Sequence, residues 1–229
     1  DDTGIFEKNL FVDYIRDKTS EDGSDLGQHL NSIFETMNMT TAERQRNIDE
    51  LLGAFPYVNG GLFRESLRTA YFDSETREKL LECCDFEWGV ISPAIFGSMF
   101  QSVMNPQERR ELGAHYTTEK NILKLIEPLF LDELKAEFEH IRNLKIGKAK
   151  RLEEFHHKIA GLGFFDPACG CGNFLVVTYR ELRRLEMRII EELDENQRLM
   201  GKVFSLVNVE QFYGIEIEEF PARIAETAM

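Results

Sequence analysis

The sequence predicts a mainly α-helical N-terminal region followed by the start of an α/β domain that contributes one βαβ unit. Apolar residues recur at helical spacing through most of residues 1–105, as in packed helices. Further on, a short apolar stretch leads into a glycine-rich turn and a long amphipathic helix, residues 173–193, and a second apolar stretch follows at residues 212–217. Two parallel strands joined by a crossover helix produce this pattern. We therefore expect two domains, residues 1–105 and 106–229.

The helices of the first region are predicted from apolar periodicity, capping residues and proline stops. They cover residues 5–16, 26–37, 41–53, 74–84 and 92–103. The aromatic segment at residues 55–63 contains a proline and an Asn-Gly pair, which are typical of turns. Since none of its side chains can perform catalysis, we interpret this segment as a packed surface turn.

The middle of the chain is also expected to be helical. Threonines in the loop at residues 113–122 can cap a helix that covers residues 119–134. Residues 129–160 carry helical stripes that are interrupted at Gly147, which predicts a helical hairpin. Residues 132–135 superficially offer the Glu-x-Lys of a metal-dependent nuclease. However, they lie within a helix and lack an upstream acid, so we do not assign them that role.

Composition limits the class of protein. The chain has 229 residues, of which 42% are hydrophobic and 30% charged, so it can bury a sizeable core. The formal net charge of −14 argues against a broad phosphate-binding face. Acids flank the densest basic cluster, which predicts a solvated turn between helices. This cluster contains Lys145, Lys148, Lys150 and Arg151.

No apolar run approaches the length that crosses a bilayer, and the first residues lack the basic and apolar regions of a signal peptide. We therefore expect a cytoplasmic protein without membrane contacts, and the missing initiator Met suggests a trimmed chain. The cysteines, Cys83, Cys84, Cys169 and Cys171, do not have the Cys-x2-Cys spacing of a zinc site. We interpret them as reduced, buried thiols and expect no bound metal.

The glycine-rich turn has the features of a nucleotide-cofactor site. Asp166 ends the apolar stretch, Gly170 and Gly172 let a ligand approach bare backbone, and Asn173 opens the long helix. The third glycine of the dinucleotide fingerprint is missing, and an acid before the turn would repel a pyrophosphate. A carboxylate at this position suits a ligand that carries an ammonium group.

A second acid is predicted beside this turn. Glu216 lies at the carboxyl end of the second apolar stretch, where an acid can accept both hydroxyls of a ribose. Glu218 and Glu219 are alternatives for this role, and a solvated acid at the end of a strand is the simpler interpretation. We favour Glu216 as the ribose ligand.

Three motifs resemble those of S-adenosylmethionine-dependent DNA methyltransferases that act on exocyclic amino groups. The string Asp-Pro-Ala-Cys-Gly-x-Gly-x-Phe-Leu from Asp166 resembles their first motif, Gly-Ile-Glu-Ile from Gly214 their second, and Gly-x-x-Tyr-Thr from Gly113 their tenth. His115 stands where phenylalanine is commoner in the tenth motif, which covers the methionine end of the cofactor. The resemblance implies that the following residues bind S-adenosylmethionine: Tyr116, Thr117, Asp166, Pro167, Ala168, Cys169, Gly170, Gly172, Phe174, Glu216 and Ile217.

The resemblance extends over nearly the whole chain. The motif order is that of amino-methyltransferases whose target-recognition region follows the catalytic domain, and most of these methylate adenine N6. Residues 55–63 and 91–100 are similar to the helical spacer of MmeI-like restriction-modification fusion enzymes. The family implies a Rossmann-like class I methyltransferase domain whose sheet is incomplete in this chain. It also implies that DNA is held mainly by regions outside the chain and that the C-terminal half of the parent enzyme is a partner.

The residues that carry out methyl transfer in this family have no counterpart here. The family binds the flipped base with Asn-Pro-Pro-Phe or Asn-Pro-Pro-Tyr after the cofactor half, whereas the Asn-Pro pair of this chain, Asn105-Pro106, precedes it. We therefore assign no catalytic residue and expect this chain alone to be inactive. A methyltransferase of RNA, protein or small molecules and a non-catalytic scaffold module remain alternatives.

Overall fold

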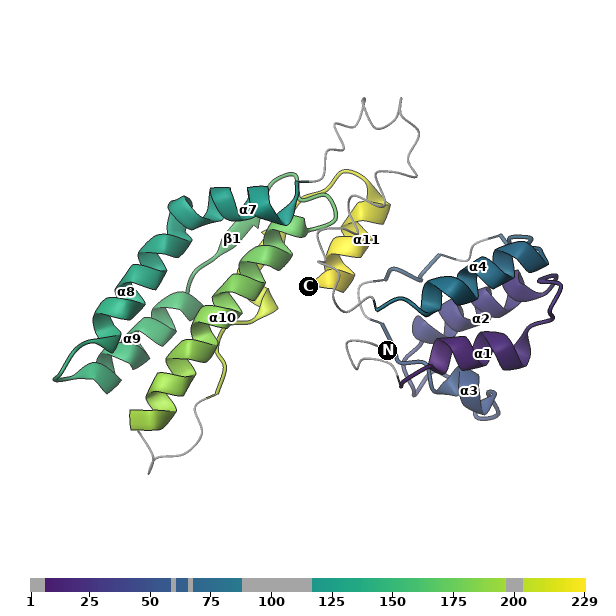
Figure 1. The fold of residues 1–229 in the computed structure, drawn as a ribbon, viewed down its shortest axis with the longest axis horizontal. Coiled ribbons are helices and arrows are strands. Elements are labelled where there is room, and N and C mark those ends of the chain that lie inside the picture. The colour runs from purple at the N-terminus through teal and green to yellow at the C-terminus, as the bar shows by residue number, and fades with distance from the viewer. Residues whose placement is uncertain (1–6, 59–60, 66–67, 88–116, 197–203) are drawn as a thin grey trace. The chain divides into compact units, whose positions relative to one another are not determined.

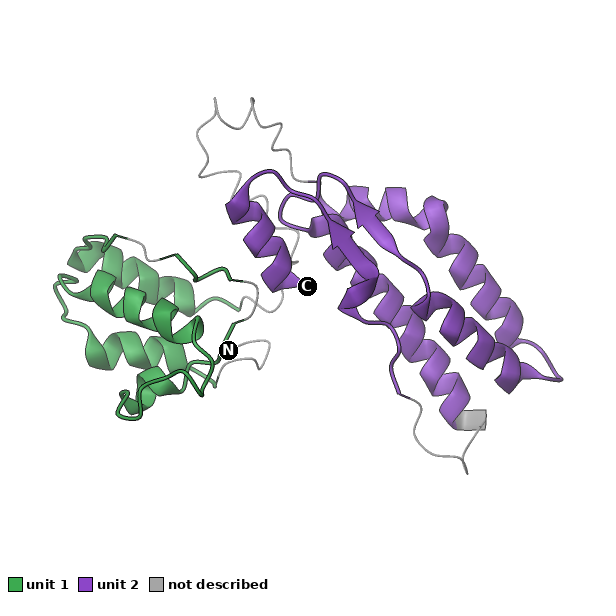
Figure 2. Cartoon of the chain, turned by 180° about the vertical axis from the view of Figure 1, so that it is seen from behind, with its two compact units in different colours: residues 1–92 green, residues 93–229 purple. Residues whose placement is uncertain are grey.

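The computed structural model describes residues 7–58, 61–65, 68–87, 117–196 and 204–229. The chain divides into two compact units, residues 1–92 and 93–229, which Figure 2 distinguishes by colour. The predicted domain boundary at residues 105–106 and the predicted helix at residues 92–103 lie outside the described residues. No helix in the described part of the chain has both the length and the apolar character needed to cross a membrane.

Four helices of the first unit are described, and they are labelled in Figure 1. They are α1 (Leu10–Lys18), α2 (Leu26–Met37), α3 (Glu50–Gly53) and α4 (Ser74–Cys84). The bounds of α2 and α4 confirm the predictions for 26–37 and 74–84, whereas α1 begins later than the prediction of residue 5. The buried core of this unit consists of Leu10, Tyr14, Ile15, Leu26, Ile33, Met37 and Phe55.

The helix predicted at residues 41–53 is wrong in extent, because only α3 forms. Thr40 and Glu43 form part of the capping pattern that usually begins a helix. The Glu43 carboxylate accepts hydrogen bonds from the Thr40 N–H at 2.9 Å and from the Thr40 hydroxyl at 2.7 Å. The Arg44 guanidinium then donates to the carbonyl oxygens of Thr36, Met39 and Gly53. These contacts hold the segment as a folded loop.

Residues 55–58 and 61–63 pack as expected for a surface turn. Phe55 is buried against Tyr14, with their rings perpendicular at 5.7 Å between centroids. The Val58 N–H donates to the Met37 carbonyl at 2.8 Å, and Phe63 stacks on Phe34 at 5.0 Å. The aromatic residues of this segment thus serve the core of the first unit.

The second unit contains a long helical layer. It is formed by α7 (Glu119–Ile126), the π-helical turn η2 (Glu127–Leu131), α8 (Asp132–Arg142), α9 (Lys148–Ala160) and α10 (Asn173–Asn196). A further helix, α11 (Glu219–Ala228), follows β2 and lies beside Gly172 rather than in this layer. The predicted helix from Glu119 therefore continues past Leu134 to Arg142. Pro128 lies in η2, where the wider turn accommodates a residue that has no N–H to donate. Gly147 separates α8 from α9 with a φ of 72°, which confirms the hairpin.

The two described strands, β1 (Phe164–Asp166) and β2 (Phe212–Gly214), pair in parallel. Phe164 is in register with Phe212, and Asp166 with Gly214. Because α10 joins the two strands, the predicted βαβ unit is confirmed. The second strand was predicted to continue to residue 217. It ends earlier, although the Ile215 N–H still donates to the Asp166 carbonyl at 3.0 Å.

One face of this sheet is covered and the other is open. Phe164 and Phe212 stack at 5.1 Å and pack against the core that α8, α9 and α10 share. Phe165 and Tyr213 point the opposite way, since side chains alternate along a strand, and they remain 60% and 59% exposed. The second unit therefore presents paired aromatic side chains on its open sheet face.

Candidate cofactor-binding site

The turn between β1 and α10 requires its glycines. Gly170 and Gly172 have φ values of 55° and 81°, in the left-handed region that disfavours residues with a Cβ atom. A Cβ atom on Gly172 would also lie 3.0 Å from the Cβ of Ala225 in α11. The Gly172 N–H donates to the Cys169 carbonyl at 2.8 Å, and the Gly172 carbonyl accepts from Val176 in the first turn of α10. The turn thus ends directly in the helix N-terminus.

Asp166 ends β1 and points one carboxylate oxygen into the turn. Its Oδ1 accepts a hydrogen bond from the Ala168 N–H at 3.0 Å. Within the described part of the chain, no donor contacts Oδ2. The side chain is half-buried, so this second oxygen can accept a hydrogen bond from a ligand.

Glu216 connects the turn to the end of β2. Its Oε2 accepts a hydrogen bond from the Gly170 N–H at 2.8 Å. Its Oε1 accepts from the N–H groups of Ile217 and Glu218 at 2.8 Å and 3.0 Å. The two predicted acids therefore flank one turn, as expected where neighbouring parallel strands end at the same edge of a sheet.

Cys169 fills the space between the turn and β2. A Cβ atom on Gly214 would lie 2.7 Å from its sulfur, so the close approach needs glycine at that position. Burial raises the pKa of the Cys169 thiol, and the negative charges of Asp166 and Glu216 raise it further. A protonated thiol is a poor nucleophile, and the sulfur of Cys169 packs closely against Gly214.

The segment that contains Thr117 begins a helix beside this turn. Glu119 in the first turn of α7 forms an ion pair with Arg180 of α10 at 2.6 Å. Phe174 packs against a small core in which Ile122 of α7 meets Val177 of α10. Thr118 occupies the N-cap position of α7, but its side chain makes no capping hydrogen bond, contrary to the prediction.

The remaining predicted site residues differ in how they are placed. Pro167 and Ala168 are exposed in the turn, and Ile217 is 88% exposed beside Glu216. Tyr116 lies outside the described residues. Among the cysteines, Cys171 is buried but Cys83 is exposed, so the prediction of buried thiols is wrong for Cys83. None of these four described cysteines forms a disulfide.

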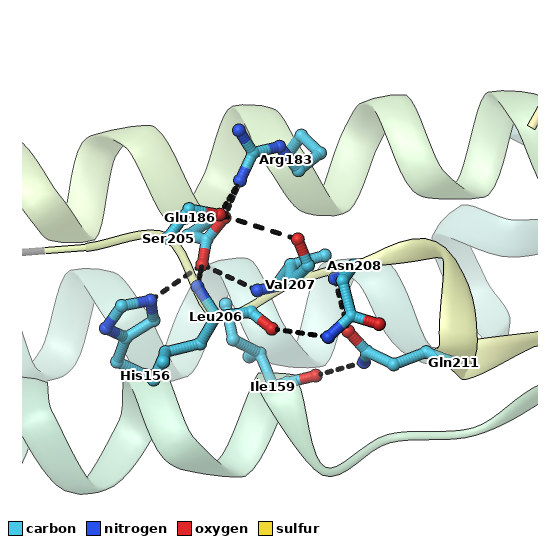
Figure 3. A network of polar contacts seen from close by, with 9 residues as sticks. All are labelled: His156, Ile159, Arg183, Glu186, Ser205, Leu206, Val207, Asn208 and Gln211. Atoms are coloured by element: carbon cyan, nitrogen blue, oxygen red, sulfur yellow. Dashed lines mark hydrogen bonds and ion pairs between the residues drawn. The ribbon is translucent and has the colours of Figure 1, made fainter. Parts of the chain in front are cut away.

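A buried polar network, shown in Figure 3, lies beside the candidate site and was not predicted from the sequence. At its centre is the carboxylate of Glu186 in α10, which is fully buried and contacts His156 of α9 at 2.7 Å. One signal could have revealed it, because Glu186 lies between Leu182 and Ile189 on the apolar stripe of the predicted helix. An acid on such a stripe needs hydrogen-bond donors in the core.

Models of two related domains match separate parts of this chain. The model described as the MmeI helicase spacer domain matches residues 1–63, and that described as the MmeI DNA-methyltransferase domain matches residues 142–229. These matches agree with the predicted order of spacer and cofactor half.

Two curated relatives are also DNA methyltransferases or restriction-modification enzymes. DNA methyltransferase A of Bacillus subtilis (strain 168) is 41% identical over 233 residues and matches 100% of this chain, which spans 25% of that protein. A putative type II restriction enzyme and methyltransferase of Methanocaldococcus jannaschii is 24% identical, and the match covers 85% of this chain and 20% of that protein.

A similar solved structure is that of the Type IIL restriction-modification enzyme MmeI in complex with DNA. It is 56% identical with a TM-score of 0.82, and the match covers 98% of this chain and 30% of that chain. This chain thus spans only a fifth to a third of the length of these proteins. In sequence and fold, this chain is similar to MmeI-like restriction-modification enzymes across their helical spacer and the first part of their DNA-methyltransferase domain.

Proposed function

We propose that this chain is the spacer and cofactor-binding half of a DNA methyltransferase that uses S-adenosylmethionine and methylates adenine N6. One observation carries the proposal: Asp166 and Glu216 flank a glycine-rich turn, and Glu216 is bonded to the Gly170 N–H in that turn at 2.8 Å. In this proposal the domains remain residues 1–105 and 106–229. DNA and the C-terminal half of the parent enzyme are the partners.

The donors and acceptors of the turn fit the chemistry of S-adenosylmethionine. The free Oδ2 of Asp166 can accept a hydrogen bond from the ammonium group of the amino-acid end. The Oε2 of Glu216 has one donor in the structure and retains a lone pair for a ribose hydroxyl. The left-handed glycines leave the backbone without side chains where the ligand would pass.

Within this proposal, the residues of the chain bind and orient rather than react. S-adenosylmethionine supplies an electrophilic methyl group on a sulfonium centre, and the transfer needs no metal. Asp166 would hold the amino-acid end of the cofactor and Glu216 its ribose, on either side of the sulfonium centre, and so fix the direction in which the methyl group points. The α7 segment that begins near Thr117 would cover the methionine end. Positioning of this kind lowers a barrier by restricting the reactants to a productive geometry. The target adenine would be flipped out of the duplex and held by residues outside this chain.

The open face of the sheet supports a larger domain. Parallel sheets are found almost only with helices on both faces, yet Phe165 and Tyr213 on one face of this sheet are 60% and 59% exposed. A continuing Rossmann-like domain would add strands at the edges of this sheet and helices that cover these side chains. The paired aromatic residues therefore favour the start of a class I methyltransferase domain over a self-contained scaffold module.

Calorimetry with S-adenosylmethionine, S-adenosylhomocysteine and NAD tests the proposal. We expect the two sulfur compounds to bind more tightly than NAD, because an acid precedes the turn and the third dinucleotide glycine is absent. Tighter binding of NAD would refute the cofactor assignment. Binding of neither class would favour the scaffold alternative. Methylation of RNA, protein or small molecules in preference to duplex DNA would support the other methyltransferase alternative.

A further inference from the structure

We propose that the buried carboxylate of Glu186 is a positioning residue for the cofactor site, because it fixes the segment that places β2, and with it Glu216, beside the glycine-rich turn. The inference rests on the proposed function insofar as Glu216 binds a cofactor. The claim that Glu186 fixes the position of β2 is the mechanical part of this proposal. It concerns only the polar network and the strands, so it can be tested without any ligand.

Glu186 gathers donors from three parts of the unit (Figure 3). His156 of α9 contacts Oε1 at 2.7 Å through Nε2, which must carry the proton because a carboxylate only accepts. The N–H groups of Leu206 and Val207 donate to the same oxygen at 2.6 Å and 2.8 Å. Oε2 accepts from the Ser205 hydroxyl at 2.9 Å and from the Arg183 guanidinium. A side chain on α10 thereby fixes α9 and the segment that leads to β2.

A second set of contacts carries this constraint to β2. Asn208 and Gln211 form a capping box, in which the Asn208 N–H donates to Gln211 Oε1 at 3.0 Å. The Nε2 of Gln211 donates to the carbonyls of Ile159 and Leu162, both at 2.9 Å. These carbonyls lie at the end of α9 and just before β1. The residue after Gln211, Phe212, begins β2. The register of β2 against β1 is therefore fixed both by the Glu186 contacts and by the Gln211 contacts that precede the strand.

Glu216 lies only a few residues beyond this anchored point. Between them, the Ile215 N–H donates to the Asp166 carbonyl, and the Ile215 carbonyl accepts from the Cys169 N–H at 2.9 Å. A shift of β2 would therefore move Glu216 away from the Gly170 N–H. Strand register matters here because a slip by one residue would turn every side chain to the opposite face.

The charge of Glu186 is essential to this role. Glutamine has nearly the same shape, but it replaces one acceptor oxygen with an NH2 group that can only donate. That NH2 group would face donors that the carboxylate oxygen now accepts, and these donors would lose their hydrogen bonds. The Glu186→Gln variant should therefore disturb the Ser205–Val207 segment selectively. Ile189→Val is the matched control, because Ile189 is buried in the same helix and core and has no polar contact with this segment.

Hydrogen–deuterium exchange on the whole chain tests the mechanical part. In Glu186→Gln, the N–H groups of Gly170, Ile215 and Ile217 should exchange faster than in the unmodified chain. The exchange of N–H groups in α8 should change much less. In Ile189→Val, any loss of protection should be shared between α8 and the strands. Uniform loss of protection in Glu186→Gln would overturn the proposal, because the residue would then contribute only to global stability.

Calorimetry with S-adenosylmethionine, at a temperature where all variants are folded, tests the link to the cofactor. We expect Glu186→Gln to raise the Kd about tenfold, which is ~1.4 kcal/mol, and Ile189→Val to leave it unchanged. Equal affinities of Glu186→Gln and the unmodified chain would overturn the positioning role. If the unmodified chain binds no cofactor, the proposed function fails, while exchange still decides whether Glu186 positions β2.

Ser205→Ala provides a milder test if Glu186→Gln does not fold. It removes one donor from Oε2 and leaves the carboxylate charged. The same N–H groups should then exchange faster by a smaller factor. Unchanged exchange at Gly170, Ile215 and Ile217 in Ser205→Ala would count against the proposal.

Discussion

Glu216 accepts a hydrogen bond from the Gly170 N–H at 2.8 Å, although 46 positions separate the two residues. The contact joins the acid after β2 to the glycine-rich turn after β1. Gly170 can hold its left-handed conformation because it has no Cβ atom, and the carboxylate of Glu216 satisfies its N–H in that conformation. The same carboxylate is the proposed ribose ligand, so the geometry of the turn and cofactor binding depend on one side chain.

Glu216→Ala should weaken the binding of S-adenosylmethionine by about 1.5 to 3 kcal/mol, the range for hydrogen bonds to a charged group. Calorimetry measures this change, and thermal unfolding checks that the variant is folded. Glu218→Ala is the control, because Glu218 is the nearby alternative for the ribose role and its side chain is exposed. A weaker affinity in Glu218→Ala with no change in Glu216→Ala would reassign the role to Glu218.

Gly172→Ala should destabilise the chain by about 1 to 2 kcal/mol from the left-handed conformation alone, and by more because the new methyl group meets Ala225. Two controls separate the causes. Gly147 also has a positive φ but has open space around its Cβ position, and Gly163 combines open space with a φ that is not in the left-handed region. Urea unfolding should rank the losses as Gly172→Ala, then Gly147→Ala, then Gly163→Ala. An equal loss for Gly172→Ala and Gly147→Ala would show that contact with α11 is unimportant.

The stability that Glu186 contributes should depend on pH. Burial alone would raise the pKa of this carboxyl, but hydrogen bonds from the Val207 N–H, His156 and the Leu206 N–H outweigh burial and lower it. A lowered pKa in the folded state stabilises the chain at pH values above the unfolded value of about 4.3. That contribution is lost as the pH falls through the folded pKa. His156 and Arg183 are the ionisable side chains in contact with Glu186.

Urea unfolding of the unmodified chain and Glu186→Gln between pH 7 and pH 3 measures this contribution. We expect the difference in unfolding free energy to be largest at pH 7 and to shrink below about pH 4.3. His156→Gln, which removes the neighbouring titratable ring, separates its titration from that of Glu186. A difference that stays constant down to pH 3 would contradict a carboxylate that titrates in this range.

The features that depend on local sequence were predicted well. Helix α2 and helix α4 have the predicted bounds because apolar periodicity and capping residues are local signals. Helix α10 begins at the predicted Asn173 for the same reason. The proximity of Asp166 and Glu216 was also predictable, since parallel strands that are neighbours end at the same edge of a sheet.

The features that depend on tertiary contacts were not predicted. The Arg44 guanidinium binds carbonyl oxygens on both sides of its loop, and these contacts replace the helix that Thr40 and Glu43 suggest locally. The network around Glu186 draws its donors from α9 and from residues 205–207, which periodicity alone does not bring together. The Gly170 contact of Glu216 depends on the conformation of the turn itself.

The last prediction concerns methyl transfer by the chain alone, which we expect to be undetectable on duplex DNA. The sequence lacks the Asn-Pro-Pro-aromatic motif that binds the flipped base in the family, and Phe165 and Tyr213 leave the sheet face open. An unpaired sheet with exposed apolar side chains is a surface that other strands or helices can cover. Transfer should therefore appear when the region that follows the matching segment in a full-length relative is added in trans. Asp166→Asn, which keeps the shape of the side chain but removes its charge, should abolish the restored activity. Efficient transfer by the chain alone would show that the reacting groups lie within these residues.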